Sequence, residues 1–327
     1  MRRASSRNSV PAALRAKGRI AVSFERRGDG ATRPVSLEEA GGFRMRFPRV
    51  HGTVPPSSAE TEGAVCEASI INTGGGMAGG DRLTVEVEAR RDARILLSTP
   101  SAERVYGSTG PAAEIALAFR LGGGSRLIWL PRETILYSGS RLERRIDVEM
   151  HGGASLVIAE MTVFGRLAAG ERMRSGLLAE RWSIRRDGRL LHAERTRLEG
   201  EIGQLLDRGA IGGGARAAAT VVMASSRAED RLAAVRARLR RAHSEWGASA
   251  WDGMLVGRFL GADAATLRSD LVRFLLAAGE SRLPHSWARD PIGEDAANPD
   301  AVERTDASMA NNRAGSLMED EVEPDPA

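Results

Sequence analysis

Two glutamates stand out because each lies in a segment whose other residues suit the interior of a β protein. Glu160 ends the apolar run Leu-Val-Ile-Ala of residues 156–159. Glu194 follows His192 by two positions, so in a strand both side chains lie on one face. Buried carboxylates are usually paired, and an arginine partner is therefore one interpretation. The other interpretation is a polar passage through the protein, and the sequence leaves both open.

Other side chains that bind metals or act as nucleophiles show no clustered pattern. The chain has one cysteine, Cys66, and five histidines at positions 51, 151, 192, 243 and 285. No His-x-x-x-His or Cys-x-x-Cys spacing occurs, which argues against a dedicated zinc or nickel cage. Cys66 lies in an apolar stretch and is predicted to be a small core residue. No Gly-x-Ser-x-Gly elbow occurs, and nothing indicates a nucleophilic enzyme.

Residues 72–81, Asn-Thr-Gly-Gly-Gly-Met-Ala-Gly-Gly-Asp, are a third candidate site because five of the ten are glycine. Their spacing matches the dinucleotide-binding pattern Gly-x-Gly-x-x-Gly, which needs a helix directly behind it. A strand-like alternation follows at residues 83–89 instead, and the Lys and Ser/Thr of a phosphate loop do not follow Gly80. We therefore predict a tight strand-to-strand connection in which Asp81 accepts hydrogen bonds from nearby backbone amides.

Length and charge set the broad class. The 327 residues suffice for a sizeable core in one or two domains, and the net charge is +4. Residues 289–327 carry eleven acids against three arginines, so the rest of the chain holds about +12. The densest basic cluster, arginines 236, 238, 240 and 241, has few aromatic residues around it and matches no DNA-binding motif. A solvated helix face is therefore favoured over nucleic-acid binding.

The sequence shows no membrane span and no secretory signal. No apolar run approaches the ~18 residues that a spanning helix needs. Residues 1–18 hold five basic residues, no acid and no hydrophobic stretch of the secretory kind. A single cysteine excludes an internal disulfide and fits a reducing compartment. We predict a cytoplasmic protein with a disordered leader at residues 1–18.

The elements that must position these residues are mainly strands. Period-two alternation and short apolar runs predict strands at residues 19–24, 43–47, 65–71, 83–89, 93–99, 115–121, 127–130, 142–150, 155–160, 178–185 and 189–198. Residues 25–42 and 48–62 are predicted to be polar loops. About a dozen short strands in residues 19–224 favour a sandwich, barrel or solenoid over alternating βαβ units. No repeat of fixed length is visible.

The pattern changes at residue 225. Ser226-Arg227-Ala228-Glu229 matches a capping box. Apolar residues then recur at helical spacing, namely Leu232, Val235, Leu239, Ala242 and Trp246. Residues 254–260 indicate a strand, and Asp263 is placed to cap a second helix that ends before Gly279. The sequence thus predicts a β body at 19–224, a small α/β appendage packed on it at 225–288, and an acidic disordered tail at 289–327.

These segments together resemble the urease accessory protein UreD family, called UreH in some bacteria. The matching segments, in family order, are residues 43–49, 72–81, 102–108, 129–138, 160, 164–166, 170–171 and 182–198. The combination of Asn-Thr-x-Gly-Gly-x-x-Gly-Gly-Asp with Leu-Pro-x-Glu-Thr-Ile is specific to that family. Two positions depart from its pattern: Gly107, where arginine is usual, and His285, which replaces an arginine in Leu-Pro-Arg-x-Trp.

The resemblance implies a fold and a role. The fold is a mainly β, helically wound body of many short strands with a small C-terminal two-helix appendage. The role is that of a non-enzymatic accessory protein that binds UreF, which recruits the GTPase UreG, and docks on urease apoprotein to deliver nickel. No tightly bound cofactor is implied; nickel is bound transiently along an internal path, whose acidic positions Glu160 and Glu194 match.

The matching motifs also imply structural roles for particular residues. These are Asn72, Gly75, Gly79, Gly80, Asp81, Tyr106, Pro131, Glu133, Thr134, Gly165 and Arg166. Two other classes of protein remain open from the residues alone. One is a hydrolase or nucleotide-binding enzyme that uses the glycine segment, which specific binding of labelled nucleotide would favour. The other is a nucleic-acid-binding β protein, which salt-dependent retention of DNA would favour.

Overall fold

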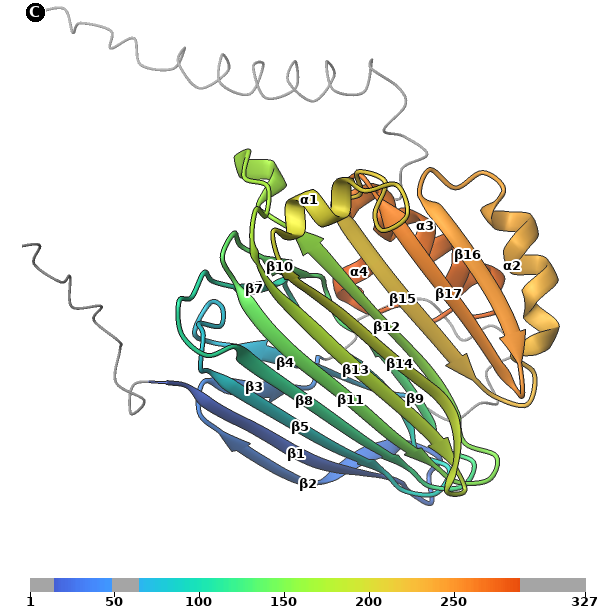
Figure 1. The fold of residues 1–327 in the computed structure, drawn as a ribbon. Helices are drawn as coiled ribbons and strands as arrows, with labels where there is room; N and C mark the ends of the chain where they lie inside the picture. The colour runs from blue at the N-terminus through green and yellow to red at the C-terminus, as the bar shows by residue number, and fades with distance from the viewer. Residues whose placement is uncertain (1–14, 49–64, 289–327) are drawn as a thin grey trace, which may run out of the picture. The chain divides into compact units, whose positions relative to one another are not determined.

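The computed structural model describes residues 15–48 and 65–288, and this part of the chain consists mainly of strands (Figure 1). The described residues up to Trp287 belong to one compact unit. Within the described residues the strands form two sheets, one of seven and one of ten strands. The predicted mainly β class is confirmed.

The smaller sheet has parallel strands at its centre and antiparallel strands at its edges. Its strands, in order across the sheet, are β14 (Arg189–Gly200), β13 (Gly176–Arg186), β11 (Arg141–Met150), β8 (Ala113–Leu121), β5 (Arg82–Ala89), β1 (Lys17–Arg26) and β2 (Thr32–Ala40). Only β2 and β14 pair antiparallel with their neighbours. In β8 and β11 buried residues alternate with more exposed ones, because one face packs inward and the other meets solvent.

The larger sheet follows the same plan but is covered on both faces over much of its width. Its main path is β16 (Glu245–Trp251), β17 (Met254–Gly261), β15 (Ala217–Ala224), β12 (Ser155–Phe164), β9 (Arg126–Leu130), β6 (Arg94–Ser98), β4 (Cys66–Asn72) and β3 (Phe43–Arg46). Two short strands, β10 (Thr134–Leu136) and β7 (Glu103–Val105), pair beside β12. Every residue of β12 after Ser155 is buried, as expected for a strand covered on both faces.

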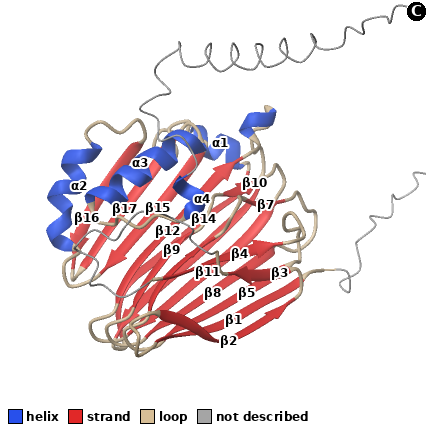
Figure 2. Ribbon diagram, turned by 180° about the vertical axis from the view of Figure 1, so that it is seen from behind, coloured by secondary structure: helices blue, strands red, loops and turns tan. Residues whose placement is uncertain are grey.

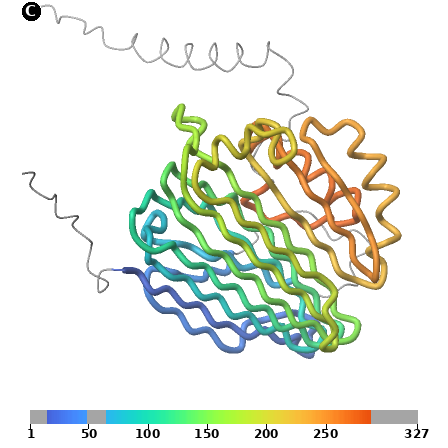
Figure 3. The backbone as a smooth tube through the Cα atoms, in the orientation of Figure 1, coloured from blue at the N-terminus to red at the C-terminus, as the bar shows by residue number. Residues whose placement is uncertain are grey.

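The chain winds helically between the two sheets. From β4 it passes to β5, β6, β8, β9, β11, β12 and β13, and apart from the short β7 and β10 successive strands alternate between the larger and the smaller sheet. Figure 3 shows the result as a gradual colour change across neighbouring strands. Strands one turn apart pair in parallel, such as β5 with β8 and β8 with β11. The predicted helically wound β body is therefore confirmed.

Helices cover the outer face of the larger sheet (Figure 2). α2 (Leu232–Leu239) packs on β16, and α3 (Ala264–Ala277) packs on β15 and β17. α3 begins as predicted, since Asp263 accepts a hydrogen bond from the Thr266 amide at 2.8 Å. It is followed by Gly279 at φ +85°, a value that favours glycine. Two shorter helices are α1 (Ile202–Asp207) and α4 (His285–Ala288).

Two apolar clusters hold these layers together. One lies between the sheets and includes Phe24, Phe119 and Trp182. The other lies between the larger sheet and the helices, where the rings of Phe259 and Phe274 are 5.8 Å apart. Burial of each such side chain contributes roughly 1.5–3 kcal/mol. The polar residues inside the first cluster are consequently exceptions that need partners.

The predicted helix over residues 232–246 is wrong in its second half. α2 ends at Leu239, and Trp246 lies in β16. The predicted capping box at Ser226 is also absent, because a short 3-10 helix, η3 (Glu229–Arg231), precedes α2 and no side chain caps it. Trp246 satisfies a helical period and a strand period equally, and antiparallel pairing with β17 favours the strand.

The predicted polar loop over residues 25–42 is also wrong, since it contains β2. β2 is an edge strand with mostly exposed side chains, so it lacks the alternation by which strands are recognised.

The strand predicted at 155–160 continues to Phe164. Strands β16 and β17 extend the larger sheet beyond β15, so the sheet has no break at residue 225. The division at 225 stays a prediction, and residues 1–14 and the tail lie outside the described residues.

Candidate functional site

A buried ion pair lies at the centre of the interface between the two sheets. Arg144 projects inward from β11 of the smaller sheet, and Glu160 projects toward it from β12 of the larger sheet. Arg144 Nη1 is 2.5 Å from Glu160 Oε2, and both side chains are less than 5% exposed. The interpretation that Glu160 is a carboxylate paired with an arginine is therefore correct. The sequence signal for its partner was a charged residue on the otherwise apolar face of residues 142–150.

Both side chains of this pair have further polar neighbours. Trp129 donates from Nε1 to Glu160 Oε1 at 2.7 Å. Arg144 donates to Glu180 through Nε at 2.6 Å and also contacts it through Nη2. Its remaining donors reach two hydroxyls, Thr134 Oγ1 at 3.1 Å and Thr162 Oγ1 at 3.2 Å. A buried polar group is tolerated only when it is satisfied in this way.

The two carboxylates on Arg144 keep the charges at this site closely coupled. Burial raises the pKa of Glu160 above its usual range, and Arg144 and the Trp129 indole only partly oppose that shift. Burial alone would lower the pKa of Arg144, but the charges of Glu160 and Glu180 outweigh it and raise that pKa. Arg144 is thus a permanent cation, and Glu160 is a carboxylate with a reduced preference for the charged form.

The second predicted glutamate, Glu194, lies on β14 at the edge of the smaller sheet. Its Oε2 is 2.7 Å from Nη2 of Arg258 on β17 and 3.4 Å from Nε2 of His192. Thr220 of β15 donates to its Oε1 at 3.5 Å. Burial alone would raise the pKa of Glu194, but contacts with His192 and Arg258 outweigh burial and hold that pKa below its usual range. Glu194 is therefore ionised at neutral pH.

Neighbouring cavities that share lining residues lie along the line from one glutamate to the other. Glu160 lines both a cavity of about 130 Å³ on the side of the glycine segment and a central cavity of about 220 Å³. Thr196 and Thr220 line both the central cavity and a third cavity of about 420 Å³ that Glu194 also lines. Thr220 is the register partner of Glu160 on one side and of Arg258 on the other. The structure thus brings both predicted glutamates to one row of cavities between the sheets.

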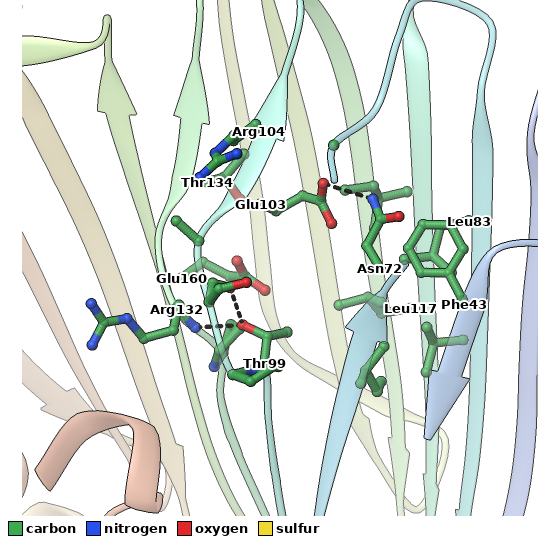
Figure 4. Close-up of a pocket in the computed structure, with 18 of the residues that line it drawn as sticks. Phe43, Asn72, Leu83, Thr99, Glu103, Arg104, Leu117, Arg132, Thr134 and Glu160 are labelled. Atoms are coloured by element: carbon green, nitrogen blue, oxygen red, sulfur yellow. Dashed lines mark hydrogen bonds between the residues drawn. The ribbon is translucent and has the colours of Figure 1, made fainter. Parts of the chain in front are cut away.

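A third carboxylate, which the sequence did not single out, lies at the glycine-side end of this row. Glu103 of β7 accepts a hydrogen bond from Asn72 Nδ2 at 2.9 Å. It lines the same cavity as Glu160 and Thr134 (Figure 4). Burial raises the pKa of Glu103 to about 7. We call Glu103, Glu160, Thr220 and Glu194 the polar row.

The glycine segment connects the two sheets at this end, running from β4 to β5. As predicted, Asp81 accepts backbone hydrogen bonds, from Ala78 at 2.7 Å and Ala16 at 2.8 Å. Gly75 and Gly80 have φ values of +75° and +88°. Gly79 is needed for a different reason, because a Cβ there would lie 2.0 Å from Ser108 Oγ and 2.5 Å from a carbonyl oxygen. A strand rather than a helix follows, so the dinucleotide-binding geometry is absent.

The other motif residues position the loops around this end. Tyr106 donates to the Gly75 carbonyl at 2.9 Å, and its ring meets Tyr137 edge-on. Arg166 lies over Tyr137 and pairs with Glu171, while Gly165 has φ +106°. Two further motif residues contact the C-terminal helices: Glu133 pairs with Arg268 at 2.7 Å, and the Pro131 carbonyl accepts from Trp287.

Outside the polar row, the described residues show few features suited to metal binding or to crossing a membrane. Among them no group of three or more His, Cys, Asp or Glu side chains is placed to hold a metal ion. Burial raises the pKa of the Cys66 thiol to about 11, which makes the thiol unreactive. No helix in residues 15–48 or 65–288 is long and apolar enough to cross a membrane. The basic cluster on α2 is exposed, and Arg236 bonds the Ala248 carbonyl.

The fold and the site together define a class of protein: a helically wound β sandwich with charged and hydroxyl side chains in a row of cavities between its sheets. The model of the UreD urease accessory protein family matches residues 16–291. The chain belongs to the UreD urease accessory protein family. The family predicted from the glycine and Leu-Pro-x-Glu-Thr-Ile motifs is thereby confirmed.

Individual relatives match over most of their length. The urease accessory protein UreD of Rhodopseudomonas palustris strain HaA2 is 42% identical over 86% of this chain and 96% of its own. UreD of Methylobacterium sp. strain 4-46 is 42% identical over 85% and 97%. UreD 3 of Methylorubrum extorquens strain PA1 is 45% identical over 79% and 84%.

Proposed function

We propose that this protein acts in urease maturation as a non-catalytic nickel-delivery chaperone, and that nickel passes along the polar row between the sheets. The observation that carries the proposal is the placement of Glu160 and Glu194 in one row of adjoining cavities, bridged by Thr220. Family membership supports the connection to urease. Nickel is the cargo in this proposal and no tightly bound cofactor is invoked.

The chemistry of the row suits a conduit better than a storage site. A conduit must release its ion as readily as it takes it up, so each metal-binding position, or station, along it must have low affinity for the ion. Glu160 and Glu194 each already have an arginine counter-ion, Arg144 and Arg258, which competes with a metal cation. Oxygen ligands are also poorer ligands for nickel than thiolates or imidazole clusters. Both features keep the stations weak.

The partners in the proposal are UreF, the GTPase UreG and urease apoprotein, in a cytoplasmic heteromeric complex. They follow from the family resemblance of the motif residues, and the geometry adds one constraint. The row lies inside the sandwich, so its two ends, near Glu103 and near Glu194, are the places where nickel enters and leaves. Partners must therefore cover these two ends.

The test measures nickel-dependent activation of urease apoprotein by purified complexes that carry Glu160→Gln, Glu194→Gln or both changes. Glutamine keeps the size and the hydrogen-bond acceptor, so the fold is retained while the ligand charge is lost. We expect each single variant to activate severalfold less urease than wild type and the double variant to activate least. Glu149→Gln is the matched control, because Glu149 is an exposed glutamate near Arg185 on the outer face of the smaller sheet.

Assembly and stability are measured on the same samples. The proposal expects the glutamine variants to stay folded, with a smaller loss of stability for Glu160→Gln than removal of the side chain would cause, and to capture UreF, UreG and urease normally. Full activation by a stable double variant would remove both glutamates from the mechanism. Nucleotide or urea turnover by the pure protein would instead require an enzyme, and we expect none.

A further inference from the structure

His192 carries a buried nitrogen with no hydrogen bond. Its side chain is 5% exposed and projects from β14 on the same face as Glu194. The Nε2 atom lies 3.4 Å from Glu194 Oε2, an ion-pair distance at which the geometry does not make a hydrogen bond. Buried polar atoms without a partner are rare and call for an explanation. Here the orphan nitrogen points at a carboxylate that lines a cavity of about 420 Å³.

An imidazole nitrogen and a carboxylate oxygen at this separation fit one metal ion. Ligand atoms bound at about 2.1 Å, with an angle of 90–110° between them, stand roughly 3.0–3.4 Å apart. We propose that His192 Nε2 and the Glu194 carboxylate form a two-ligand site for a divalent transition-metal ion at this end of the polar row. This inference rests on the proposed function, because it defines one station of that path.

The nitrogen ligand makes this station differ from the one at Glu160. Around Glu160 the polar neighbours are the Trp129 indole, which donates only, the Arg144 cation and threonine hydroxyls. A cation there meets oxygen ligands only, which magnesium and calcium also accept. Imidazole at Glu194 favours nickel, zinc and similar ions over magnesium. The row would thus select its metal at the Glu194 end.

Arg258 closes this site when no metal is bound. Its Nη2 lies 2.7 Å from the same oxygen, Glu194 Oε2, that faces His192. The Arg258 side chain is 59% exposed, so it can swing into solvent, whereas Arg144 is 3% exposed and held by several partners. Pairs with such an exposed member are weak. A metal ion can therefore displace Arg258, and the returning arginine favours release of the metal.

The experiment titrates Ni²⁺ into the purified full-length chain by calorimetry, with Co²⁺ absorption as a second readout of nitrogen ligation and Mg²⁺ for comparison. We expect His192→Gln to weaken Ni²⁺ binding at least about tenfold, the size seen when even an outer-shell partner of a metal ligand is lost. Arg258→Ala is expected to strengthen it severalfold. His151→Gln is the matched control, because His151 lies 3.7 Å from Asp187 in an exposed pair elsewhere.

Melting temperatures of all variants show whether they fold. Equal Ni²⁺ affinity of folded His192→Gln, His151→Gln and wild type would overturn the site, as would Mg²⁺ binding as tight as Ni²⁺ binding. Urease activation separates this inference from the proposed function. If activation depends on Glu160 and Glu194 but Ni²⁺ affinity is unchanged in His192→Gln, only the proposed His192 site is refuted. If His192 is needed for Ni²⁺ binding while the double glutamine variant activates fully, only the conduit is wrong.

Discussion

At the scale of single residues, Glu160 both forms an ion pair and lines two cavities. The sequence left a paired carboxylate and a polar passage as alternatives, yet the geometry places Arg144 on Glu160 and cavities on either side of it. The two properties are compatible, because an arginine counter-ion offsets the cost of burying the carboxylate and also weakens its hold on a cation. Removal of Glu160 must therefore affect stability as well as passage.

We expect Glu160→Leu to lower the free energy of unfolding by about 3 kcal/mol. The change deprives the buried Trp129 indole of its acceptor, which costs roughly 1–3 kcal/mol, and leaves Arg144 with Glu180 as its only carboxylate. Urea denaturation measures the effect. Glu160→Gln should lose less, because its amide oxygen still accepts from Trp129. Unchanged stability of the leucine variant would show that the ion pair contributes nothing.

Glu103 predicts a dependence of stability on pH. Its folded-state pKa of about 7 lies above the ordinary 4.5, so the folded protein binds the proton more tightly than the unfolded chain. The protonated form therefore stabilises the fold below pH 4.5, and this contribution is lost as pH rises to 7, by up to about 3 kcal/mol. Glu103→Gln, which stays neutral and can still accept from Asn72, should be more stable than wild type at pH 8 by up to that amount.

The measurement is urea denaturation of both proteins at pH 5 and pH 8. The advantage of Glu103→Gln should be small at pH 5 and large at pH 8. An advantage of equal size at both pH values would mean that Glu103 titrates normally in the folded protein and that its burial carries no electrostatic cost.

At the scale of elements, alternation was enough to predict the inner strands but not their partners or the edges. β8 and β11 were predicted closely, because one face of each is buried along its whole length. β2 was missed because an exposed edge strand carries no such pattern. The start of β16 was assigned to a helix because Trp246 fits both periods. The candidate site followed the same rule. Glu160 and Glu194 were found from their own strands. Thr220 and Arg258 join them through strand pairing, and Arg144 through packing of one sheet on the other, and no local pattern encodes either.

Alanine substitutions in the glycine segment can separate the effect of a steric clash from that of a positive φ. Gly79→Ala should cost more stability, roughly 2–3 kcal/mol, than Gly75→Ala, at about 1 kcal/mol. A Cβ at Gly79 would clash with Ser108 and with a backbone carbonyl, whereas at Gly75 it meets only open space and carries just the strain of positive φ. Gly28→Ala, with open space and no positive φ, is the control. Thermal denaturation ranks the three. The reverse order for Gly75 and Gly79 would mean that backbone strain outweighs the close approach.

At the scale of the whole molecule, the two layers contribute different things to the site. The smaller sheet supplies the cation Arg144 and the edge residues His192 and Glu194, and the larger sheet supplies Glu160, Thr220 and Arg258. The polar row therefore exists only when both sheets are assembled, and neither sheet could hold it alone. Helices α3 and α4 reach the same region from the outer side, through Arg268 on Glu133 and Trp287 on the Pro131 carbonyl. Loss of those helices should loosen residues 131–134, of which Pro131, Arg132 and Thr134 line the first cavity.

The position at which the chain can be shortened follows from those contacts. The described residues up to Trp287 belong to one compact unit, and the family model ends at residue 291. Trp287 is 3% exposed and its indole donates to the Pro131 carbonyl at 3.3 Å.

A chain that ends at residue 288 should keep its melting temperature within a few degrees and keep urease activation. A chain that ends at residue 283 also loses Trp287, and removal of so large a buried side chain costs roughly 3–5 kcal/mol, or about 10 °C in melting temperature. Similar melting temperatures for the two truncations would show that Trp287 does not anchor the body. Loss of activation by the longer one, at full stability, would assign residues 289–327 a role in partner binding.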